Sequence, residues 1–389
     1  MSPQPKHTCL QPTLGIDASR ANAAKRTGTE WYAFHLIQEL KRVIPPSMRV
    51  ILYSKEPLRD GLENLPPNWE SAVLKWPGKF WTQLRLSWEM LRRPPNTLFV
   101  PAHTLPLILP RRSATTLHDV AFMVRKEAYT FAERLYHRFA ARFAVRRAAA
   151  LLTVSEFSKA EIVRFFGAKP ERIAVTPLGY DLKNCRMAES EPEIVSALSR
   201  YAIKRPYFLF VGRLEAKKNL GGLLQAFSSF IADEPRPGYQ LVLVGKRGVG
   251  YDAAAREHAE LLKKGRVLEV GYVCPEDLRF LYSGATALVL PSWYEGFGLP
   301  VIEAWACCAP VIASRVASLP EIGGDAVEYV DPARSESIAA ALHRLANDNS
   351  RRAELIIRGT ERLDNYSWRR TAELTWGVLH SLVEEGKCE

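Results

Sequence analysis

The sequence of 389 residues has no long run of apolar side chains. Its most apolar stretch, residues 98–110, is interrupted by prolines and a histidine, whereas a helix that crosses a membrane needs about 20 consecutive apolar residues. The first twelve residues, MSPQPKHTCLQP, also lack the apolar core of a secretion signal. We therefore expect a cytoplasmic protein without a membrane-spanning segment.

Patterns that bind metals are missing too. The six cysteines form no C-x-x-C pair, and two of them, Cys307 and Cys308, are adjacent, which indicates reduced thiols rather than a disulfide framework or a zinc site. The sequence has no Asp-x-Asp pair and no cluster of histidines and carboxylates with the spacing of metal ligands. We expect neither a metal ion nor another cofactor.

Positive charge is in excess, and the excess is confined to the first half of the chain. The sequence holds 53 Lys and Arg against 42 Asp and Glu, a net charge of +11. Residues 1–190 hold 29 against 16, a net charge of +13, and the remaining residues hold 24 against 26, a net charge of −2. Such a half attracts polyanions, so its expected partner is an acidic membrane surface, a lipid diphosphate or a nucleic acid.

Short apolar runs alternate with amphipathic stretches along the chain. The runs predict buried strands at 13–17, 49–53, 97–100, 114–117, 151–154, 172–176, 207–211, 241–245, 266–270 and 287–290. Regular alternation of strands and helices favours parallel sheets with right-handed crossovers. We predict two α/β domains, at 1–190 and 205–364, and a last helix from 367 to 382 that packs back on the first domain.

The stretch from Leu288 to Asp331 carries the densest set of functional signals. A strand ends before the loop 294–298, whose two glycines let backbone N–H groups approach a ligand, and Pro300 suits the first turn of a helix. The N–H groups at a helix N-terminus attract phosphate or sugar oxygens. Glu295 and Glu303 lie on either side of this helix start, and carboxylates can accept hydrogen bonds from pairs of hydroxyl groups.

A second strand, at 207–211, ends at the loop Gly212-Arg213-Leu214-Glu215-Ala216-Lys217-Lys218-Asn219. Arg213 and Lys218 are two cations five positions apart at the end of a buried strand. Parallel α/β sheets bind their ligands at this edge, where two cations suit a diphosphate. The loop therefore predicts a second part of one anion-binding site.

The run EGFGLPVIEA, residues 295–304, resembles the nucleotide-sugar site of retaining glycosyltransferases of family 4, and so do APVIAS, SLPEI and the GR…KN loop. The resemblance covers nearly the whole chain and implies the GT-B fold, in which two Rossmann-like domains face a cleft. It differs at Cys308, where the family usually has a glycine that ends the helix. A residue without glycine's freedom is strained there if its φ is positive.

The resemblance also implies roles for individual residues. Glu295 would contact the donor hexose and Glu303 the ribose hydroxyls, Arg213 and Lys218 would hold the leaving diphosphate, and His118 would face the sugar. The backbone of three glycine-containing loops would approach the donor. These loop residues are Gly28, Gly212, Gly296, Phe297, Gly298 and Leu299.

Two basic segments of the first half leave their partners open. The segment 76–93 mixes tryptophans with basic residues, which is typical either of an amphipathic surface at a membrane or of a core-facing stripe with a solvated back. The helix expected over 131–150 repeats arginine every four residues, at Arg134, Arg138, Arg142 and Arg146, and turns Leu135, Phe139 and Phe143 to other faces. Its like charges repel unless an anion or glutamates from other elements lie nearby.

The stretches TLHDVAF and AERLYHRFAARFAVRRA are most similar to mannosyltransferases of bacterial surface-polysaccharide assembly. This similarity implies a metal-independent, retaining transfer of mannose from GDP-mannose. The implied acceptor is a saccharide, free or linked to polyprenyl diphosphate, and the implied location is the cytoplasm or the inner face of the membrane. Transfer from UDP-glucose or UDP-galactose to a soluble acceptor is the alternative.

Two other protein classes share some of these features. A GT-B phosphorylase or a nucleotide-sugar epimerase has the same fold but matches the Glu-x7-Glu stretch less well. A nucleic-acid binder would share the basic half, but the sequence contains no recognised nucleic-acid motif and no aromatic stacking platform. We therefore expect no nucleic-acid partner.

Overall fold

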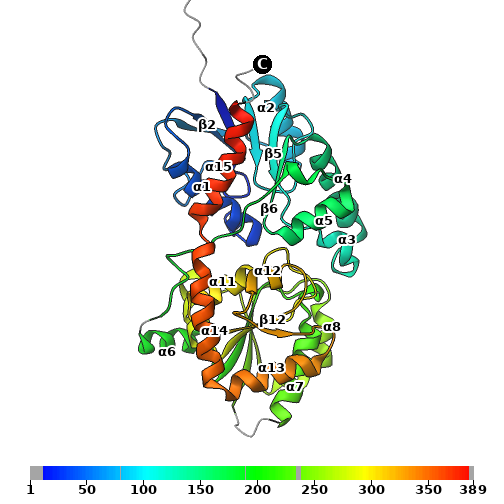
Figure 1. Cartoon of the computed structure of the whole chain (residues 1–389), viewed down its shortest axis with the longest axis vertical. Helices are drawn as coiled ribbons and strands as arrows, with labels where there is room; N and C mark the ends of the chain where they lie inside the picture. The colour runs from blue at the N-terminus through cyan, green and yellow to red at the C-terminus, as the bar shows by residue number, and fades with distance from the viewer. Residues whose placement is uncertain (1–11, 79, 189, 234–237, 385–389) are drawn as a thin grey trace, which may run out of the picture.

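The computed structural model describes residues 12–78, 80–188, 190–233 and 238–384. The chain forms two α/β domains, one above the other in Figure 1, each built on a parallel sheet that is covered by helices. The fold class expected from the sequence is confirmed. The predicted boundaries of the two domains remain a prediction.

The first domain contains a sheet of seven parallel strands in the order β3-β2-β1-β4-β5-β6-β7. Its central strands are buried on both faces, which explains their continuous apolar runs. The strands are β1 (Thr13–Asp17), β2 (Arg49–Ser54), β3 (Trp69–Val73), β4 (Thr97–Val100), β5 (Arg112–Thr116), β6 (Ala150–Thr153) and β7 (Ile173–Val175).

The helices of this domain pack on both sides of its sheet. Their bounds are α1 (Gly28–Val43), a π-helical turn (Thr82–Leu86) that continues into α2 (Ser87–Arg92), α3 (Ala121–Val124), α4 (Phe131–Arg147) and α5 (Glu156–Phe166). Short 3-10 turns lie at Lys126–Ala128 and Pro170–Arg172.

The second domain contains a sheet of six parallel strands in the order β10-β9-β8-β11-β12-β13. The strands are β8 (Tyr207–Val211), β9 (Gln240–Val244), β10 (Val267–Gly271), β11 (Ala287–Leu290), β12 (Val311–Ser314) and β13 (Glu328–Val330). The helices are α6 (Glu191–Arg200), α7 (Leu220–Asp233), α8 (Tyr251–Glu257), α9 (Ala259–Lys263), α10 (Pro275–Gly284), α11 (Leu299–Ala306), α12 (Leu319–Gly323), α13 (Ser335–Asn347) and α14 (Asn349–Arg362). Further 3-10 turns lie at Ala216–Lys218 and Leu363–Asn365.

The last helix, α15 (Trp368–Glu384), returns to the first domain and packs against α1, as the sequence predicts. The chain thus crosses between the domains twice, and the two crossings touch. Tyr180 and Ser367 form a parallel bridge, and a Cβ on Gly179 would lie 2.1 Å from the Trp368 nitrogen. Only glycine can occupy position 179 at this distance.

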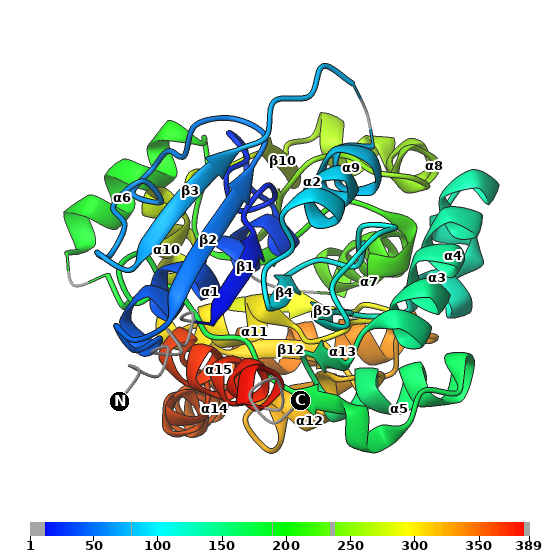
Figure 2. The ribbon, with the colours of Figure 1, turned by 90° about the horizontal axis from the view of Figure 1, so that it is seen from above.

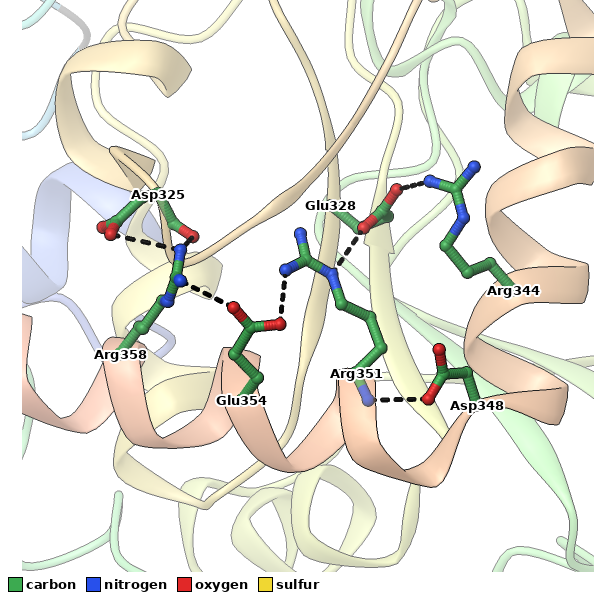
Figure 3. Close-up of polar contacts among 7 residues, drawn as sticks. All are labelled: Asp325, Glu328, Arg344, Asp348, Arg351, Glu354 and Arg358. Atoms are coloured by element: carbon green, nitrogen blue, oxygen red, sulfur yellow. Dashed lines mark hydrogen bonds and ion pairs between the residues drawn. The ribbon is translucent and has the colours of Figure 1, made fainter.

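A network of ion pairs joins three elements at one edge of the second sheet (Figure 3). The buried carboxylate of Glu328, on β13, accepts from Arg344 of α13 and from Arg351 of α14, the latter at 3.1 Å. Glu354 pairs with Arg351 and Arg358 along α14. The arginines of this edge therefore stabilise the domain itself.

The structure corrects two details of the sequence reading. The helix expected over 131–150 ends at Arg147 because Ala150 already pairs with Ala114 as part of β6. The segment 76–93 fits neither interpretation as a whole: Trp81 is buried, whereas Phe80 is 62% exposed and Trp88 is 53% exposed.

Cys308 has a φ of +55°, so the strain expected at the end of α11 is present.

No helix in the described ranges has both the length and the apolar character to cross a bilayer.

Candidate functional site

The loop between β11 and α11 lies where the sequence predicts a ligand. β11 is fully buried and ends at Leu290, and α11 begins after Gly298, whose φ of +109° suits only glycine. Pro300 occupies the first turn of α11. The loop residues Glu295 to Gly298 are buried and lie against the first domain, because a Cβ on Gly296 would be 2.8 Å from the Asp119 Cβ.

Glu295 and Lys218 form an ion pair at the base of this loop. The Lys218 Nζ lies 2.6 Å from the Glu295 Oε1, and the Ser292 hydroxyl donates to the same oxygen at 2.7 Å. Both charged side chains are nearly buried. The structure therefore brings together two predicted site residues that are 77 positions apart.

Arg213 is placed less closely. Its guanidinium is 65% exposed, and its Nε lies 3.7 Å from the nearest Glu215 carboxylate oxygen. Gly212, with a φ of +148°, turns the chain at the end of β8, where a Cβ on Gly245 would lie only 1.8 Å from the Gly212 oxygen. The loop backbone is thus fixed, whereas the Arg213 side chain extends into solvent.

Glu303 occupies the other side of the loop, on α11. It accepts a hydrogen bond of 2.9 Å from the Tyr282 hydroxyl of α10. Burial raises the pKa of Glu303 to about 7, and the nearby Asp181 raises it as well. A carboxyl group that titrates near neutral pH is uncommon and marks a candidate ligand-binding group.

His118 lies at the end of β5, packed edge-on against Tyr32 at 4.4 Å and against His103 at 5.2 Å. One ring nitrogen bonds the Pro101 carbonyl, and the buried Nε2 has no hydrogen-bond partner within the described residues. Burial lowers the pKa of His118 to about 3, so the ring is neutral at physiological pH. Its unpaired nitrogen is available to a ligand.

Lys217, which the sequence reading did not select, links the two domains. Its Nζ lies 3.2 Å from Glu215, and it faces Asp119 and Tyr129 of the first domain. Burial opposes its charge, but Asp119, Tyr129 and Glu215 outweigh burial and hold the pKa of Lys217 above its usual value. The only signal in the sequence is its place next to Lys218 in the strand-end loop.

Gly28 is the first residue of α1 and is exposed, and a Cβ there would meet nothing within 4 Å. The structure gives no steric reason for glycine at this position. The helix start itself is well formed, because Thr27 and Glu30 make a reciprocal capping box.

A cavity of about 340 Å³ lies in the first domain, near His103 and His137. Arg20, which lines the cavity, is near enough to contribute to the lowered pKa of both His103 and His137, although burial is the larger cause for each. Both charged groups and aromatic rings line it. Its lining includes Asp17, Ser19, Arg20, Lys55, Phe80, Trp81, Gln83 and Tyr136.

The site thus combines a buried ion pair, a glycine loop at a helix start, a carboxyl group with a pKa near 7 and a neutral histidine. These groups come from both domains and surround their junction. No set of three or more histidine, cysteine or carboxylate side chains in the described part of the chain is arranged to hold a metal ion.

Two family models match the chain. Residues 199–362 match the model of glycosyl transferases group 1, and residues 26–184 match the model of glycosyltransferase family 4. The O-antigen chain mannosyltransferase B of Escherichia coli is 35% identical over 258 residues, which are 66% of this chain and 67% of the relative. The O-antigen chain mannosyltransferase RfbU of Salmonella typhimurium is 30% identical over 245 residues, 62% of this chain and 63% of the relative.

Solved structures resemble the whole chain in fold. The sucrose-phosphate synthase of Thermosynechococcus elongatus aligns with a TM-score of 0.74 at 20% identity, covering 97% of this chain and all of that one. Anabaena HepE in complex with UDP and glucose aligns with a TM-score of 0.72 at 17% identity, covering 96% of this chain. The solved structures support the fold, and the family models together with the relatives show that the chain belongs to the glycosyltransferases of group 1 and family 4.

Proposed function

We propose that the chain transfers mannose from GDP-mannose, with retention of configuration, to a saccharide acceptor in the assembly of a surface polysaccharide. The observation that carries the proposal is the buried pair of Lys218 and Glu295 beneath the glycine loop. A buried lysine beside a helix start suits a diphosphate, and a carboxylate beside it suits sugar hydroxyls.

The proposed reaction uses these groups in one step. The bond between the anomeric carbon and the diphosphate oxygen breaks, and the acceptor hydroxyl forms the new bond on the same face of the sugar. The hydroxyl proton passes to an oxygen of the departing diphosphate. Lys218, Arg213 and the loop N–H groups would stabilise the charge that develops on this leaving group, so no metal ion is needed.

His118 and Glu303 would position the donor. The neutral His118 ring can exchange a hydrogen bond with a sugar hydroxyl through its unpaired Nε2. Glu303, on the opposite side of the loop, would accept from the ribose hydroxyls once its carboxyl group has lost its proton.

The relatives support mannose as the transferred sugar, because both O-antigen relatives are mannosyltransferases by name. The alternative is transfer of glucose or galactose from a UDP-sugar to a soluble acceptor. It is retained because HepE, which is similar in fold, has been solved in complex with UDP and glucose. An epimerase or a phosphorylase is less well supported, since both family models describe glycosyltransferases.

A panel of nucleotide sugars tests the donor. A ligand at a hundred times its dissociation constant stabilises the folded protein by about 2.7 kcal/mol, so the correct donor should raise the melting temperature most. We expect GDP-mannose to do so, and mannose transfer to continue in excess EDTA. A larger shift with UDP-glucose would favour the alternative, and transfer lost in EDTA but restored by magnesium would contradict the metal-independent step.

The acceptor would enter the cavity of the first domain. Arg20 and Lys55 line the cavity and offer positive charge, while the exposed rings of Phe80 and Tyr136 offer faces on which a sugar ring can stack. This combination suits a saccharide that carries a diphosphate, as a polyprenyl-linked acceptor does.

Two elements beside this cavity expose apolar side chains to solvent. Trp88, on α2, is 53% exposed, and Leu135 and Phe139, on α4, are each 59% exposed. Gln83 joins the two elements through a 2.9 Å hydrogen bond to Tyr136. We name the exposed apolar side chains of residues 80–91 and of α4 the apolar surface: Phe80, Leu84, Trp88, Leu91, Phe131, Leu135 and Phe139.

The helix α4, which carries Arg134, Arg138, Arg142 and Arg146 next to its exposed apolar side chains, lies at the outer rim of the molecule in Figure 2. Apolar side chains among arginines are typical of a face that rests on an anionic membrane. We propose that the protein is peripheral on the inner face of the membrane, where it receives a lipid-linked acceptor.

Liposome sedimentation tests this location. We expect binding to vesicles with anionic lipid at low salt, release at a few hundred millimolar salt, and loss of binding when Arg138 and Arg142 are both changed to Glu, because exposed charges are screened over about one Debye length. The matched control changes Arg256 and Lys264 of the second domain to Glu. Equal sedimentation with neutral vesicles would contradict an anionic surface, and preference for DNA over vesicles would indicate a nucleic-acid partner.

A further inference from the structure

We call residues 295–298 the donor loop. Three successive carbonyl oxygens of this loop accept hydrogen bonds from buried serine hydroxyls. The Ser318 Oγ lies 2.9 Å from both the Glu295 and the Phe297 oxygen. The Gly296 oxygen, between them, lies 2.6 Å from the Ser155 Oγ and 3.1 Å from the Ser158 Oγ. All three serines are fully buried.

The serines come from different domains. Ser318 precedes α12 in the domain of the loop, whereas Ser155 and Ser158 belong to the first turn of α5 in the other domain. A contact also runs in the opposite direction. The carboxylate of Glu321, on α12, accepts from the backbone N–H groups of Glu156 at 2.9 Å and Phe157 at 3.0 Å, so the second domain helps to cap α5.

The carbonyl bonds determine where the loop N–H groups point. In a trans peptide the carbonyl of one residue and the N–H of the next point in opposite directions. The bonds to the Glu295 and Phe297 oxygens therefore orient the N–H groups of Gly296 and Gly298, and the bonds to the Gly296 oxygen orient the N–H of Phe297. Two of these directions are set within the second domain, and the third is set by the first domain.

These three N–H groups donate no hydrogen bond within the described residues. The loop that carries them is buried. Buried N–H groups in native proteins are nearly always paired, so the donor loop is prepared for an acceptor from outside the chain. Phosphate or sugar oxygens have that chemistry.

We propose that Ser155 and Ser158 are positioning residues that turn the Phe297 N–H toward the donor, and that Glu321 holds the domains together while they do so. The inference rests on the proposed transfer from a nucleotide sugar. It means that the donor loop of the second domain is completed by the first domain. The orientation of the Phe297 N–H, and with it the reaction of the bound donor, then depends on a closed domain junction, because an open junction leaves the Gly296 carbonyl without the hydroxyls of Ser155 and Ser158.

The more ordinary role of these serines is to cap α5. Ser155 does serve as the N-cap, since its Oγ accepts from the Ser158 N–H at 3.1 Å. The Ser158 hydroxyl has no part in this cap and donates only to the Gly296 oxygen. Ser158→Ala therefore separates the two roles: it removes a bond to the donor loop and leaves the cap of α5 intact.

The test compares Ser158→Ala and Glu321→Gln with two matched controls. Ser199→Ala removes a hydroxyl that donates within α6, and Glu156→Gln neutralises an exposed carboxylate in the first turn of α5. We expect both test variants to lower kcat by about tenfold, since small errors of orientation cost this much or more. The dissociation constant of GDP, measured by calorimetry, should stay within about twofold, and both controls should behave as the wild type.

Hydrogen exchange gives a readout that does not depend on transfer. Without ligand, peptides that cover residues 291–300 should exchange faster in Ser158→Ala than in Ser199→Ala. Faster exchange together with a wild type that transfers no sugar would support the positioning role and contradict the proposed function. Unchanged exchange and unchanged kcat in folded Ser158→Ala and Glu321→Gln proteins would overturn the inference, as would a fall in kcat fully matched by a fall in the folded fraction.

Discussion

Each domain has an arginine-rich helix on its outside, and the two helices differ in what surrounds their charges. On α14, Arg351 and Arg358 pair with carboxylates of their own helix and of neighbouring elements (Figure 3). On α4, Arg138 and Arg142 form no ion pair with any residue in the part of the chain that the structure describes.

The apolar side chains of the two helices differ as well. α14 turns Leu355 into the core, and of its large apolar side chains only Ile357 is largely exposed. α4 exposes Phe131, Leu135 and Phe139 on one side. In the second domain, paired arginines therefore hold neighbouring elements together, whereas Arg138 and Arg142 of α4 lie next to exposed apolar side chains without such a pairing among the described residues.

The largest expected effect concerns Lys218, a paired cation of the second domain that stabilises the leaving diphosphate in the proposed reaction. If its pair with Glu295 were only structural, like those of α14, Lys218→Ala would affect stability and not turnover. We expect turnover to fall by about a hundredfold or more, because a charge that stabilises the leaving group is lost. The control is Lys263→Ala, an exposed cation on α9. Steady-state kcat, normalised to folded protein, decides between the two.

Glu328→Gln sharpens the comparison from the structural side. The Glu328 side chain is buried between Arg344 and Arg351, so neutralising it leaves two arginines without their shared partner. We expect the free energy of unfolding to fall by about 2 kcal/mol, with turnover per folded molecule unchanged. Arg138→Gln on α4 should leave stability unchanged. Urea denaturation measures the free energy of unfolding of both variants. Equal losses of stability would contradict the different roles of the charges in the second domain and on α4.

A pH series examines a buried charge of the second domain that has no cation beside it. Below pH 7 the Glu303 carboxyl group is protonated, so it accepts hydroxyl donors poorly. We expect the affinity for GDP-mannose to rise about tenfold from pH 6 to pH 8, and Glu303→Gln to remove this dependence. Calorimetry at each pH measures the affinity.

The stability of the unliganded protein should change with pH in the opposite sense. The folded pKa of Glu303 is raised above its unfolded value. This group therefore lowers the free energy of unfolding as pH rises between the two values, and the loss is complete above about pH 7. A melting temperature that rises across this range in the wild type relative to Glu303→Gln would contradict the assignment.

The smallest expected effect is on membrane binding. Each basic side chain near an anionic surface contributes about 1 kcal/mol, so Arg138→Ala should weaken binding to anionic liposomes about fivefold. Arg358→Ala, the matched change on α14, should leave this binding unchanged while lowering the melting temperature. If the two variants exchanged these effects, the division of roles between α4 and α14 would be wrong.

Much of the fold could be predicted because its buried strands are short and continuously apolar. β8 and β11 have the predicted limits, since a strand buried on both faces leaves no polar residue to blur its ends. The helix 131–147 was predicted too long because the alanines after Arg147 suit a helix or a strand equally well. The sequence could not decide which side of the segment 76–93 is buried. Periodicity shows that a helix has two different faces, but it does not show which of them is covered.

The site was predictable as far as its chemistry is local. Lys218, Glu295 and Glu303 were selected because each lies in a strand-end loop or at a helix start with a recognisable pattern, and the structure places Lys218 against Glu295. The roles of Ser155 and Ser158 were not, because their contact with Gly296 spans about 140 positions and the same serines are good helix caps. Nothing in a local pattern distinguishes a capping serine from one that also reaches another domain.

The double crossing between the domains has a practical consequence for dividing the protein. α15 buries Trp368, Leu379 and Leu382 against the first domain, yet it follows α14 of the second domain in the chain. If the chain were divided at a single point near residue 190, α1 would lose its contact with α15, and α15 would remain attached to the second domain with its apolar side exposed. The first domain is a discontinuous unit, so a version that folds alone must reunite residues 12–182 with residues 367–384. A short linker could join them, because Tyr180 and Ser367 already lie side by side.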